Sequence, residues 1–182
     1  TFYKLPTSNI EKINYALLST TERNQAKNTE YAREYEEGIV FHGERNNLVK
    51  IAAIENKKGK VLIIVKSLEH GELLNDMIED SLFIHGSLNK KIREEYFNVL
   101  KDDKPCIVIA TIKIASEGLD VPDLTTLINA SANKSDNRSI QALGRILRKS
   151  GGKTKAIYID FIDKGKHGSN HSWKRLKAFK AQ

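Results

Sequence analysis

The stretch Val61-Leu-Ile-Ile-Val65 decides the fold of this chain of 182 residues, because it is an unbroken apolar run of mostly β-branched residues. Such a run is typical of a strand whose two faces are both covered. Apolar residues with helical spacing lie on either side of it, over residues 44–56 and 67–78. Further apolar runs of strand length follow at residues 81–84, 106–110, 124–128 and 156–161.

Strand and helix patterns alternate throughout residues 44–163. This alternation predicts an α/β fold of three layers, in which a mostly parallel sheet lies between helices on both faces. In such sheets, ligands bind outside the carboxyl ends of the strands. One of the expected helices spans residues 89–100, and the residues expected to face inward from it are Ile92, Tyr96, Val99 and Leu100.

Residues 1–43 are predicted to be a connector with a helical extension that leads into this domain. Residues 1–37 are polar and contain no strand-like run. Within them, residues 8–18 have the spacing of a short helix with a polar cap. Residues 20–37 are highly charged and fit either a solvated helix or a mobile arm.

The net charge of +7 is unevenly distributed along the chain. Residues 1–133 hold 17 basic and 20 acidic side chains, whereas residues 134–182 hold 13 basic and 3 acidic ones. A cationic segment suits a polyanionic partner, although a solubilising surface is the alternative. Its last part, residues 164–182, is a basic tail that could contact DNA, pack against the N-terminal segment or belong to a further domain; we expect packing with some DNA contact. The tail has Trp173, Leu176 and Phe179 at helical spacing.

Composition limits the class of protein. The apolar content of 40% and the charged content of 29% are typical of a globular domain, and no apolar run approaches the ~20 residues of a membrane span. The single cysteine, Cys106, favours a reducing compartment, so we expect a cytoplasmic protein. The chain starts without Met and is expected to be a fragment of a longer one. No group of residues has the spacing of a metal site.

A helix over residues 139–149 carries two arginines on one face. At ~100° per residue, Gln141, Arg145 and Arg148 fall on one arc, opposite a set of apolar residues that can pack. Guanidinium groups fit phosphate oxygens and stay charged at physiological pH. A solvated amphipathic helix is the competing interpretation.

The expected strands are followed by hydroxyl, amide and small residues. Taken singly these are ordinary loop residues. At successive strand ends along one edge of the sheet, they could together contact a sugar-phosphate backbone. The positions singled out are Ser67, His85, Gly86, Thr111 and, in the loop after Thr111, Gly118 and Asp120.

One stretch is a false match to a nucleotide-binding motif. The stretch Gly151-Gly-Lys-Thr154 resembles the end of a phosphate-binding P-loop. That motif needs an earlier glycine, where Leu147 stands, and it needs a strand before it and a helix after it. Here a predicted helix precedes and a predicted strand follows, so we reject it as a nucleotide-binding loop.

The residues after the expected strands and on the arginine-bearing helix resemble, in order and spacing, the motifs of the second RecA-like domain of superfamily 2 helicases. The resemblance covers residues 44–163. The phrase Gln-x-x-Gly-Arg-x-x-Arg is similar to DNA-directed members, including the group of the phage UvsW recombination and repair helicase, whereas the RNA-directed DEAD-box group typically has His at the position of Gln141. The matching elements are Val61 to Ser67 (motif IV), His85-Gly86, Thr111 with Gly118-Leu-Asp120 (motif V) and Gln141 with Arg145 and Arg148 (motif VI).

The resemblance implies a two-domain motor that binds ATP and Mg²⁺ mainly through a first RecA-like domain, whose P-loop lysine and acidic motif this chain lacks. Arg145 and Arg148 would be arginine fingers, and Gln141, Gly118 and Asp120 would line the nucleotide cleft. Ser67, His85, Gly86 and Thr111 would face the nucleic acid. The chain alone should bind ATP poorly and hydrolyse none.

The function expected from the resemblance is that of a motor domain in an ATP-dependent DNA helicase or translocase acting on branched DNA in recombination, repair or replication. Its partners would be DNA and the N-terminal RecA-like domain of the same polypeptide. The alternatives are a non-catalytic nucleic-acid-binding module of the same fold, an RNA-directed helicase of the superfamily, and a doubly wound domain that binds a small molecule.

Overall fold

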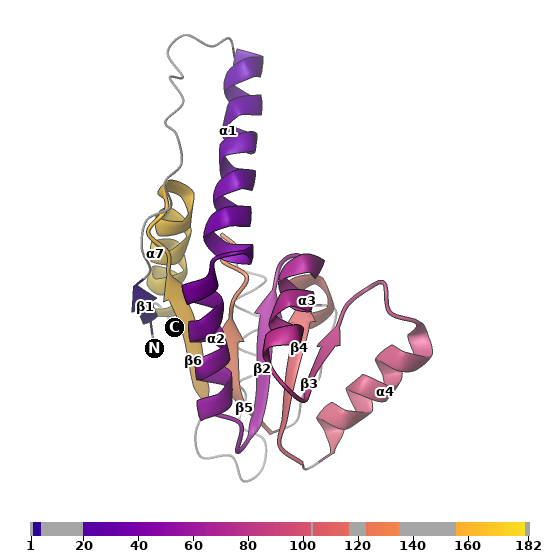
Figure 1. Ribbon diagram of the computed structural model, residues 1–182. Helices are drawn as coiled ribbons and strands as arrows, with labels where there is room; N and C mark the ends of the chain where they lie inside the picture. Colours follow the sequence, from indigo (N-terminus) through magenta and orange to yellow (C-terminus); the bar gives the residue numbers. More distant parts are fainter. Residues whose placement is uncertain (1, 5–19, 103, 117–122, 135–155, 181–182) are drawn as a thin grey trace.

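The computed structural model describes residues 2–4, 20–102, 104–116, 123–134 and 156–180. The strands among them are β1 (Phe2–Lys4), β2 (Lys60–Val65), β3 (Ser81–Ile84), β4 (Cys106–Thr111), β5 (Leu124–Asn129) and β6 (Ile157–Ile162). Within the described residues these six strands form one sheet in the spatial order β1-β6-β5-β2-β4-β3 (Figure 1). Every pairing between them is parallel, which confirms the predicted sheet.

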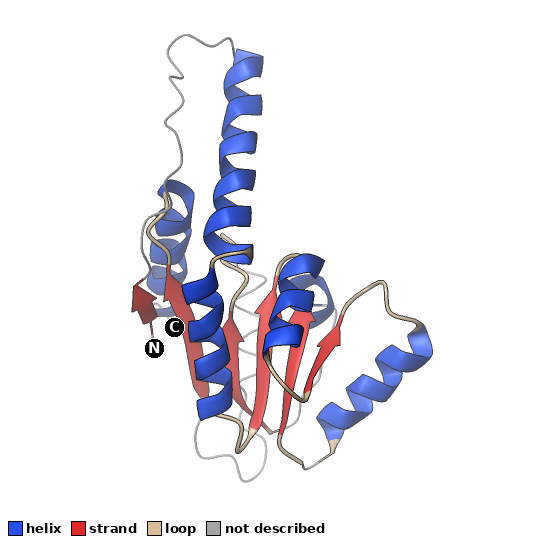
Figure 2. Cartoon of the chain, in the orientation of Figure 1, coloured by secondary structure: helices blue, strands red, loops and turns tan. Residues whose placement is uncertain are grey.

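Helices cover both faces of this sheet, as predicted (Figure 2). The helices are α1 (Thr20–Tyr35), the π-helix η2 (Glu36–Val40), α2 (Gly43–Glu55), α3 (Leu68–Met77), α4 (Lys90–Lys101), α5 (Ile112–Ser116) and α7 (Lys166–Lys180). Buried residues of α2 and α3 pack on one face of the sheet. Buried residues of α4 and α5 pack on the other, so the domain has the three layers of a RecA-like fold.

The central strand β2 is buried along its whole length. Val61, Ile63 and Val65 face the α2 and α3 layer, and Leu62 and Ile64 face the α4 and α5 layer. An apolar run without polar interruptions is what such a strand requires, because neither of its faces meets water. The stretch that decided the predicted fold is therefore the centre of the core.

The inward face predicted for α4 was partly wrong. Leu100 is fully buried and Tyr96 is half-buried, but Ile92 is 39% exposed and Val99 is 36% exposed. The reason is the position of α4, which contacts β3 and β4. Because β3 is short and lies at the edge of the sheet, there is little surface for this helix to cover.

The N-terminal segment differs from its prediction in one respect. Residues 2–4 form the strand β1, which pairs with β6, although no strand was expected there. Three residues are too few for a periodic pattern, so the partner strand and not the local sequence defines β1. Residues 20–35 form the helix α1, one of the two predicted alternatives, whereas the predicted helix at 8–18 lies outside the described residues.

The helix α1 rises beyond the carboxyl edge of the sheet, the edge at which the parallel strands end (Figure 1). Its lower part packs against α7, so the two segments that flank the predicted domain contact each other. Packing of the basic tail against the N-terminal segment was one of its predicted alternatives, and this contact confirms it.

Candidate functional site

Three predicted site residues lie at the carboxyl ends of three neighbouring strands. Ser67 follows β2, Thr111 is the last residue of β4, and His85 follows β3. These strands end at nearly the same height in the sheet. Val65 of β2 pairs with Thr111 of β4, and Ile84, the last residue of β3, pairs with Ala110, one residue before Thr111. With neighbouring strands ~4.8 Å apart, the three positions span about 10 Å of the carboxyl edge. Thr111 is buried, so it is less accessible than the other two.

Ser67 also holds the start of α3. Its hydroxyl oxygen accepts a hydrogen bond from the backbone N–H of His70 at 3.3 Å, the arrangement of a helix N-cap. The residue before it, Lys66, donates to the Tyr31 hydroxyl at 3.1 Å and lies over the rings of Tyr31 and Tyr35, 4.8 and 4.5 Å from their centroids. Helix α1 therefore covers the carboxyl edge immediately beside Ser67. Burial raises the pKa of Tyr35 to about 12, so its phenol is neutral.

The pair His85-Gly86 combines a half-buried ring with an exposed glycine. The His85 ring stacks on Phe83, with ring centroids 4.7 Å apart, and its Nδ1 is buried without a hydrogen-bond partner among the described residues. Gly86 is exposed, and a Cβ built on it would meet nothing within 4 Å. No packing contact of the described chain requires glycine at this position, which leaves room for a ligand to approach the backbone closely.

The remaining predicted site residues lie outside the described residues. These are Gly118, Asp120, Gln141, Arg145 and Arg148. Their roles as arginine fingers and cleft residues stay predictions.

A buried arginine that the sequence analysis missed lies at the ends of β5 and β6. The side chain of Arg45, on α2, is fully buried and stacks 4.9 Å from the centroid of Phe161. Its Nε donates to Asp163 at 3.0 Å, and its Nη1 donates to the Ala130 carbonyl at 3.0 Å. Arg45 lies one helical turn before the buried Val49, on the face of α2 that packs. A charged residue in line with apolar ones was therefore the sequence signal that could have predicted its burial.

A second buried arginine reaches the same strand ends from α7. Arg175 donates to both carboxylate oxygens of Asp160, at 2.8 and 3.0 Å, and to the carbonyls of Asn133 and Phe161. Burial acts to lower the pKa of Arg175, but Asp160 and Asp163 outweigh burial and raise it. An aspartate inside the apolar run 156–161 was the sequence signal, because a buried carboxylate needs a cationic partner.

These two arginines fix the loop after β5. Arg45 binds its first carbonyl, at Ala130, and Arg175 binds the carbonyl of Asn133. At the start of the loop, the side chain of Asn129, the last residue of β5, accepts from the hydroxyl of Ser131 at 2.7 Å. This loop leads into residues 135–155, in which the predicted arginine fingers lie.

A third buried polar contact joins α2 to α3. His70 is fully buried and lies 2.9 Å from Asn46 through its Nε2. Because the Asn46 amide nitrogen donates to the Val40 carbonyl, its oxygen is the acceptor and His70 Nε2 carries the proton. Burial, with a smaller effect of Arg45, lowers the pKa of His70 to about 3. The imidazole is therefore neutral at physiological pH.

Two buried glutamates of α1 hold the start of α7. The carboxylate of Glu34 accepts from the backbone N–H groups of His167 and Gly168, at 2.7 to 3.1 Å. Glu30 accepts from the Lys166 ammonium at 3.0 Å. A carboxylate at a helix N-terminus satisfies free N–H groups and is stabilised by the helix dipole. The part of the charged segment around Glu30 and Glu34 is thus anchored to the domain.

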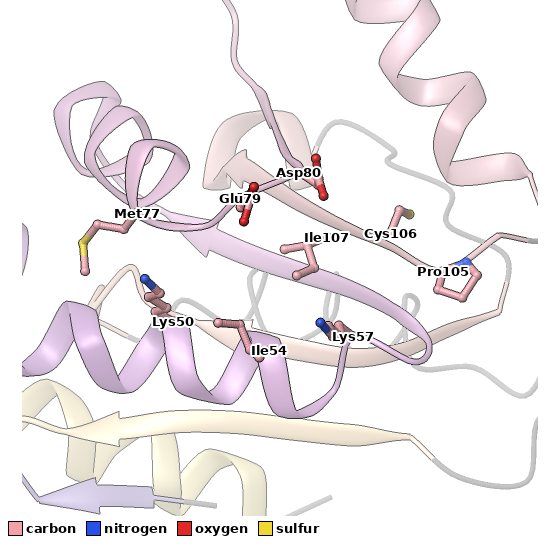
Figure 3. Close-up of a pocket in the computed structure, with 9 residues that line it drawn as sticks. All are labelled: Lys50, Ile54, Lys57, Met77, Glu79, Asp80, Pro105, Cys106 and Ile107. Atoms are coloured by element: carbon pink, nitrogen blue, oxygen red, sulfur yellow. The ribbon is translucent and has the colours of Figure 1, made fainter.

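A cavity of about 430 Å³ lies at the opposite end of the strands. Figure 3 shows Lys50 of α2 and Lys57, which follows α2, on one side of it and Glu79 and Asp80, which follow α3, on the other. It contains none of the predicted site residues, and ligand sites of parallel sheets lie at the carboxyl edge. Burial raises the pKa of its thiol, Cys106, so this cysteine is not an activated nucleophile. The lining residues are Lys50, Ile54, Lys57, Met77, Glu79, Asp80, Pro105, Cys106 and Ile107.

The described residues hold no candidate for a metal site or a membrane span. In the described part of the chain, no group of three or more His, Cys, Asp or Glu side chains could hold a metal ion. No helix in that part is long and apolar enough to cross a membrane.

The curated proteins that are similar to this chain include DNA and RNA helicases. The chain is 28% identical over 131 residues to the ATP-dependent DNA helicase uvsW of Enterobacteria phage T4, covering 69% of this chain and 26% of that protein. It is 28% identical over 142 residues to the pre-mRNA-splicing ATP-dependent RNA helicase PRP28 of Debaryomyces hansenii, covering 70% of this chain and 23% of that protein. The chain thus spans about a quarter of the length of these relatives.

Solved structures share the fold. The crystal structure of T4 UvsW matches with a TM-score of 0.63 at 21% identity, over 91% of this chain and 35% of that one. The C-terminal domain of the DEAD-box protein Dbp5 matches with a TM-score of 0.62 at 16% identity, over 78% of this chain and 81% of that one. The family model of the helicase conserved C-terminal domain matches residues 43–150, more than half of the chain. The chain therefore belongs to the helicase conserved C-terminal domain family, and its fold is the RecA-like fold of helicase C-terminal domains.

Proposed function

We propose that this domain is one half of an ATP-dependent DNA helicase or translocase that acts on branched DNA in recombination, repair or replication, in the cytoplasm. The observation that carries the proposal is the level row of Ser67, Thr111 and His85 at the ends of β2, β4 and β3. A polar row of this kind, with Gly86 open beside it, can follow a sugar-phosphate backbone.

The nucleotide would lie between this domain and a first RecA-like domain that supplies the P-loop and the Mg²⁺-binding acids. Arg145 and Arg148 would then stabilise the charge that develops on the transferred phosphoryl group, an effect of roughly 10³ to 10⁵ in rate in related chemistry. Gln141, Gly118 and Asp120 would line the same cleft. The isolated chain of 182 residues should therefore show no ATP turnover.

The test uses the full-length protein. Arg145→Ala and Arg148→Ala should each reduce DNA-stimulated ATP hydrolysis by roughly 10³ or more, with DNA affinity at a fixed salt concentration nearly unchanged. Lys101→Ala is the control, because Lys101 is exposed at the far end of α4, next to the start of β4. Turnover equal to that of the parent in both arginine variants would contradict the proposal.

An RNA-directed helicase is the second candidate, since relatives of similar identity include the RNA helicase PRP28. We favour DNA because the chain has Gln141 where the DEAD-box group typically has His. The discriminating measurement is ATP turnover of the full-length protein with branched DNA, linear duplex DNA and duplex RNA at equal salt. Stimulation by RNA alone would favour the second candidate.

A further inference from the structure

The helix α7 presents two chemically different faces. The residues that it turns toward the sheet are polar: Ser172 is fully buried and Arg175 is 5% exposed. Trp173, the single tryptophan of the chain, is 54% exposed on the other side. An exposed lone Leu or Ile is ordinary, but a large aromatic side chain left in water while an arginine is buried needs a reason.

Lysines surround Trp173 on the exposed arc. At ~100° per residue, Lys166, Asn170, Lys174 and Lys177 fall within about 100° of one another and of Trp173, and all are exposed. Lys166 is held by Glu30, whereas Lys174 and Lys177 have no ion pair with any described residue. The sequence of α7 contains no acidic residue.

The length of this face suits a nucleic acid strand. From Lys166 to Lys177 the helix rises by about 16 Å, a distance over which a strand of B-form DNA carries about five phosphates. The face is rigid, because Arg175 and Ser172 attach the helix to Asp160 and Asp163 and Glu34 holds its first turn. A rigid cationic face with one exposed aromatic ring is the arrangement on which unpaired bases stack.

We propose that the exposed face of α7 is a binding surface for single-stranded nucleic acid, separate from the row of residues at the ends of β2, β4 and β3. Trp173 stacks on an unpaired base, while Lys174 and Lys177 contact neighbouring phosphates. A single strand fits better than a duplex, because the bases of a duplex already stack on one another and cannot cover the indole. The helix lies beside β6, on the side of the sheet away from β3, so the surface extends the path available to a displaced strand (Figure 1).

The single tryptophan makes the test direct. The chain of 182 residues is titrated with an unlabelled single-stranded DNA oligonucleotide of about ten nucleotides while the emission of Trp173 is recorded. Stacking predicts saturable quenching that weakens as salt is added. In parallel, fluorescence anisotropy of a dye-labelled oligonucleotide measures binding without relying on the indole.

Variants separate the ring from the charges. Trp173→Ala should weaken binding about fivefold or more, and Trp173→Phe should lose less, because a phenyl ring still stacks. Lys174→Ala with Lys177→Ala should lower the slope of log K against log salt by about 1.4. The matched control is Lys57→Ala with Lys58→Ala, which removes the same charge from two exposed lysines just before β2, and it should leave the slope nearly unchanged.

Three results would each overturn the proposal: unchanged emission of Trp173 while anisotropy reports binding, equal affinity of Trp173→Ala and the parent, or an equal loss of slope in the control pair. Quenching by a blunt duplex as strong as that by the single strand would also contradict it. The surface stands apart from the proposed motor function, which is tested by ATP turnover in Arg145 and Arg148 variants, so either proposal can fail alone.

Discussion

At the scale of single residues, the least expected feature is the pair of buried arginines at the ends of β5 and β6. Arg175 is 5% exposed and Arg45 is fully buried, and each is paired with an aspartate of β6 or its end. A buried ion pair is not by itself strong evidence of stability, since desolvation offsets most of the attraction. Removing one partner is different, because it leaves an unpaired charge in the interior.

We predict that Arg175→Met destabilises the domain by about 3 to 5 kcal/mol, because it leaves the Asp160 carboxylate buried without its cation. The measurement is the free energy of unfolding from urea denaturation. The neighbouring substitution Lys174→Met is the control, since Lys174 is exposed and should change stability by less than about 0.5 kcal/mol. A loss of under 1 kcal/mol in Arg175→Met would contradict the structural role of this pair.

At the scale of elements, α3 lies unusually close to β3. A Cβ on Gly71 of α3 would fall within 2.1 to 2.7 Å of ring atoms of Phe83. Helix propensity alone would favour alanine over glycine inside a helix by about 1 kcal/mol. The contact with a buried aromatic ring reverses this preference, because the ring has little room to move.

We therefore predict that Gly71→Ala destabilises the domain by about 1 to 3 kcal/mol, opposite in sign to its propensity. Gly86→Ala is the matched control, because a Cβ there meets nothing within 4 Å and stability should be nearly unchanged. Thermal unfolding of the two variants beside the parent measures both effects. A stabilised Gly71→Ala would mean that α3 can shift away from β3 at little cost.

The sequence was sufficient to predict most elements and insufficient for their orientations. The β-branched run at Val61–Val65 and the alternating helices predicted the parallel sheet, since both signals are local. The strand β1 escaped detection because its only support is its distant partner β6. The buried face of α7 was also unforeseen: Arg175 is satisfied by Asp160, so tertiary pairing overrode the apolar spacing of Trp173 and Leu176.

For the candidate site too, only the residues with a local sequence signal were predicted. Ser67, His85 and Thr111 were found from their positions after strands, and the sheet register brings them level. The residues that fix the loop after β5 were missed, because Arg45 and Asp163 are 118 residues apart and their pairing has no local signature.

At the scale of the whole molecule, the buried His70 makes the stability of the folded domain depend on pH. His70 has a pKa lowered from 6.5 to about 3, so the unfolded chain binds a proton near pH 6 that the folded domain does not. Its contribution to stability is fully present above pH 6.5 and is lost as the pH falls from 6.5 toward 3. The slope of that loss is about 1.4 kcal/mol per pH unit.

We predict that His70→Gln flattens the pH dependence of unfolding between pH 6.5 and 4.5 by about that slope, although glutamine can keep the hydrogen bond to Asn46. The measurement is urea denaturation of parent and variant across this range. Other groups, such as His171, whose pKa burial also lowers, act in both proteins and cancel in the difference. Parallel pH profiles would show that His70 is protonated in the folded state.

The pairing of β1 with β6 has a consequence for how the chain folds. It joins Phe2 to Asp160, so β1 gains its neighbour only after the chain as far as β6 exists. Contacts so distant along the chain are entropically slow to form. The centre of the sheet can assemble first, around β2, β4 and β5, while the β6 side stays open. During synthesis on the ribosome, that unfinished side is the place where a nascent domain of this kind is most prone to aggregate.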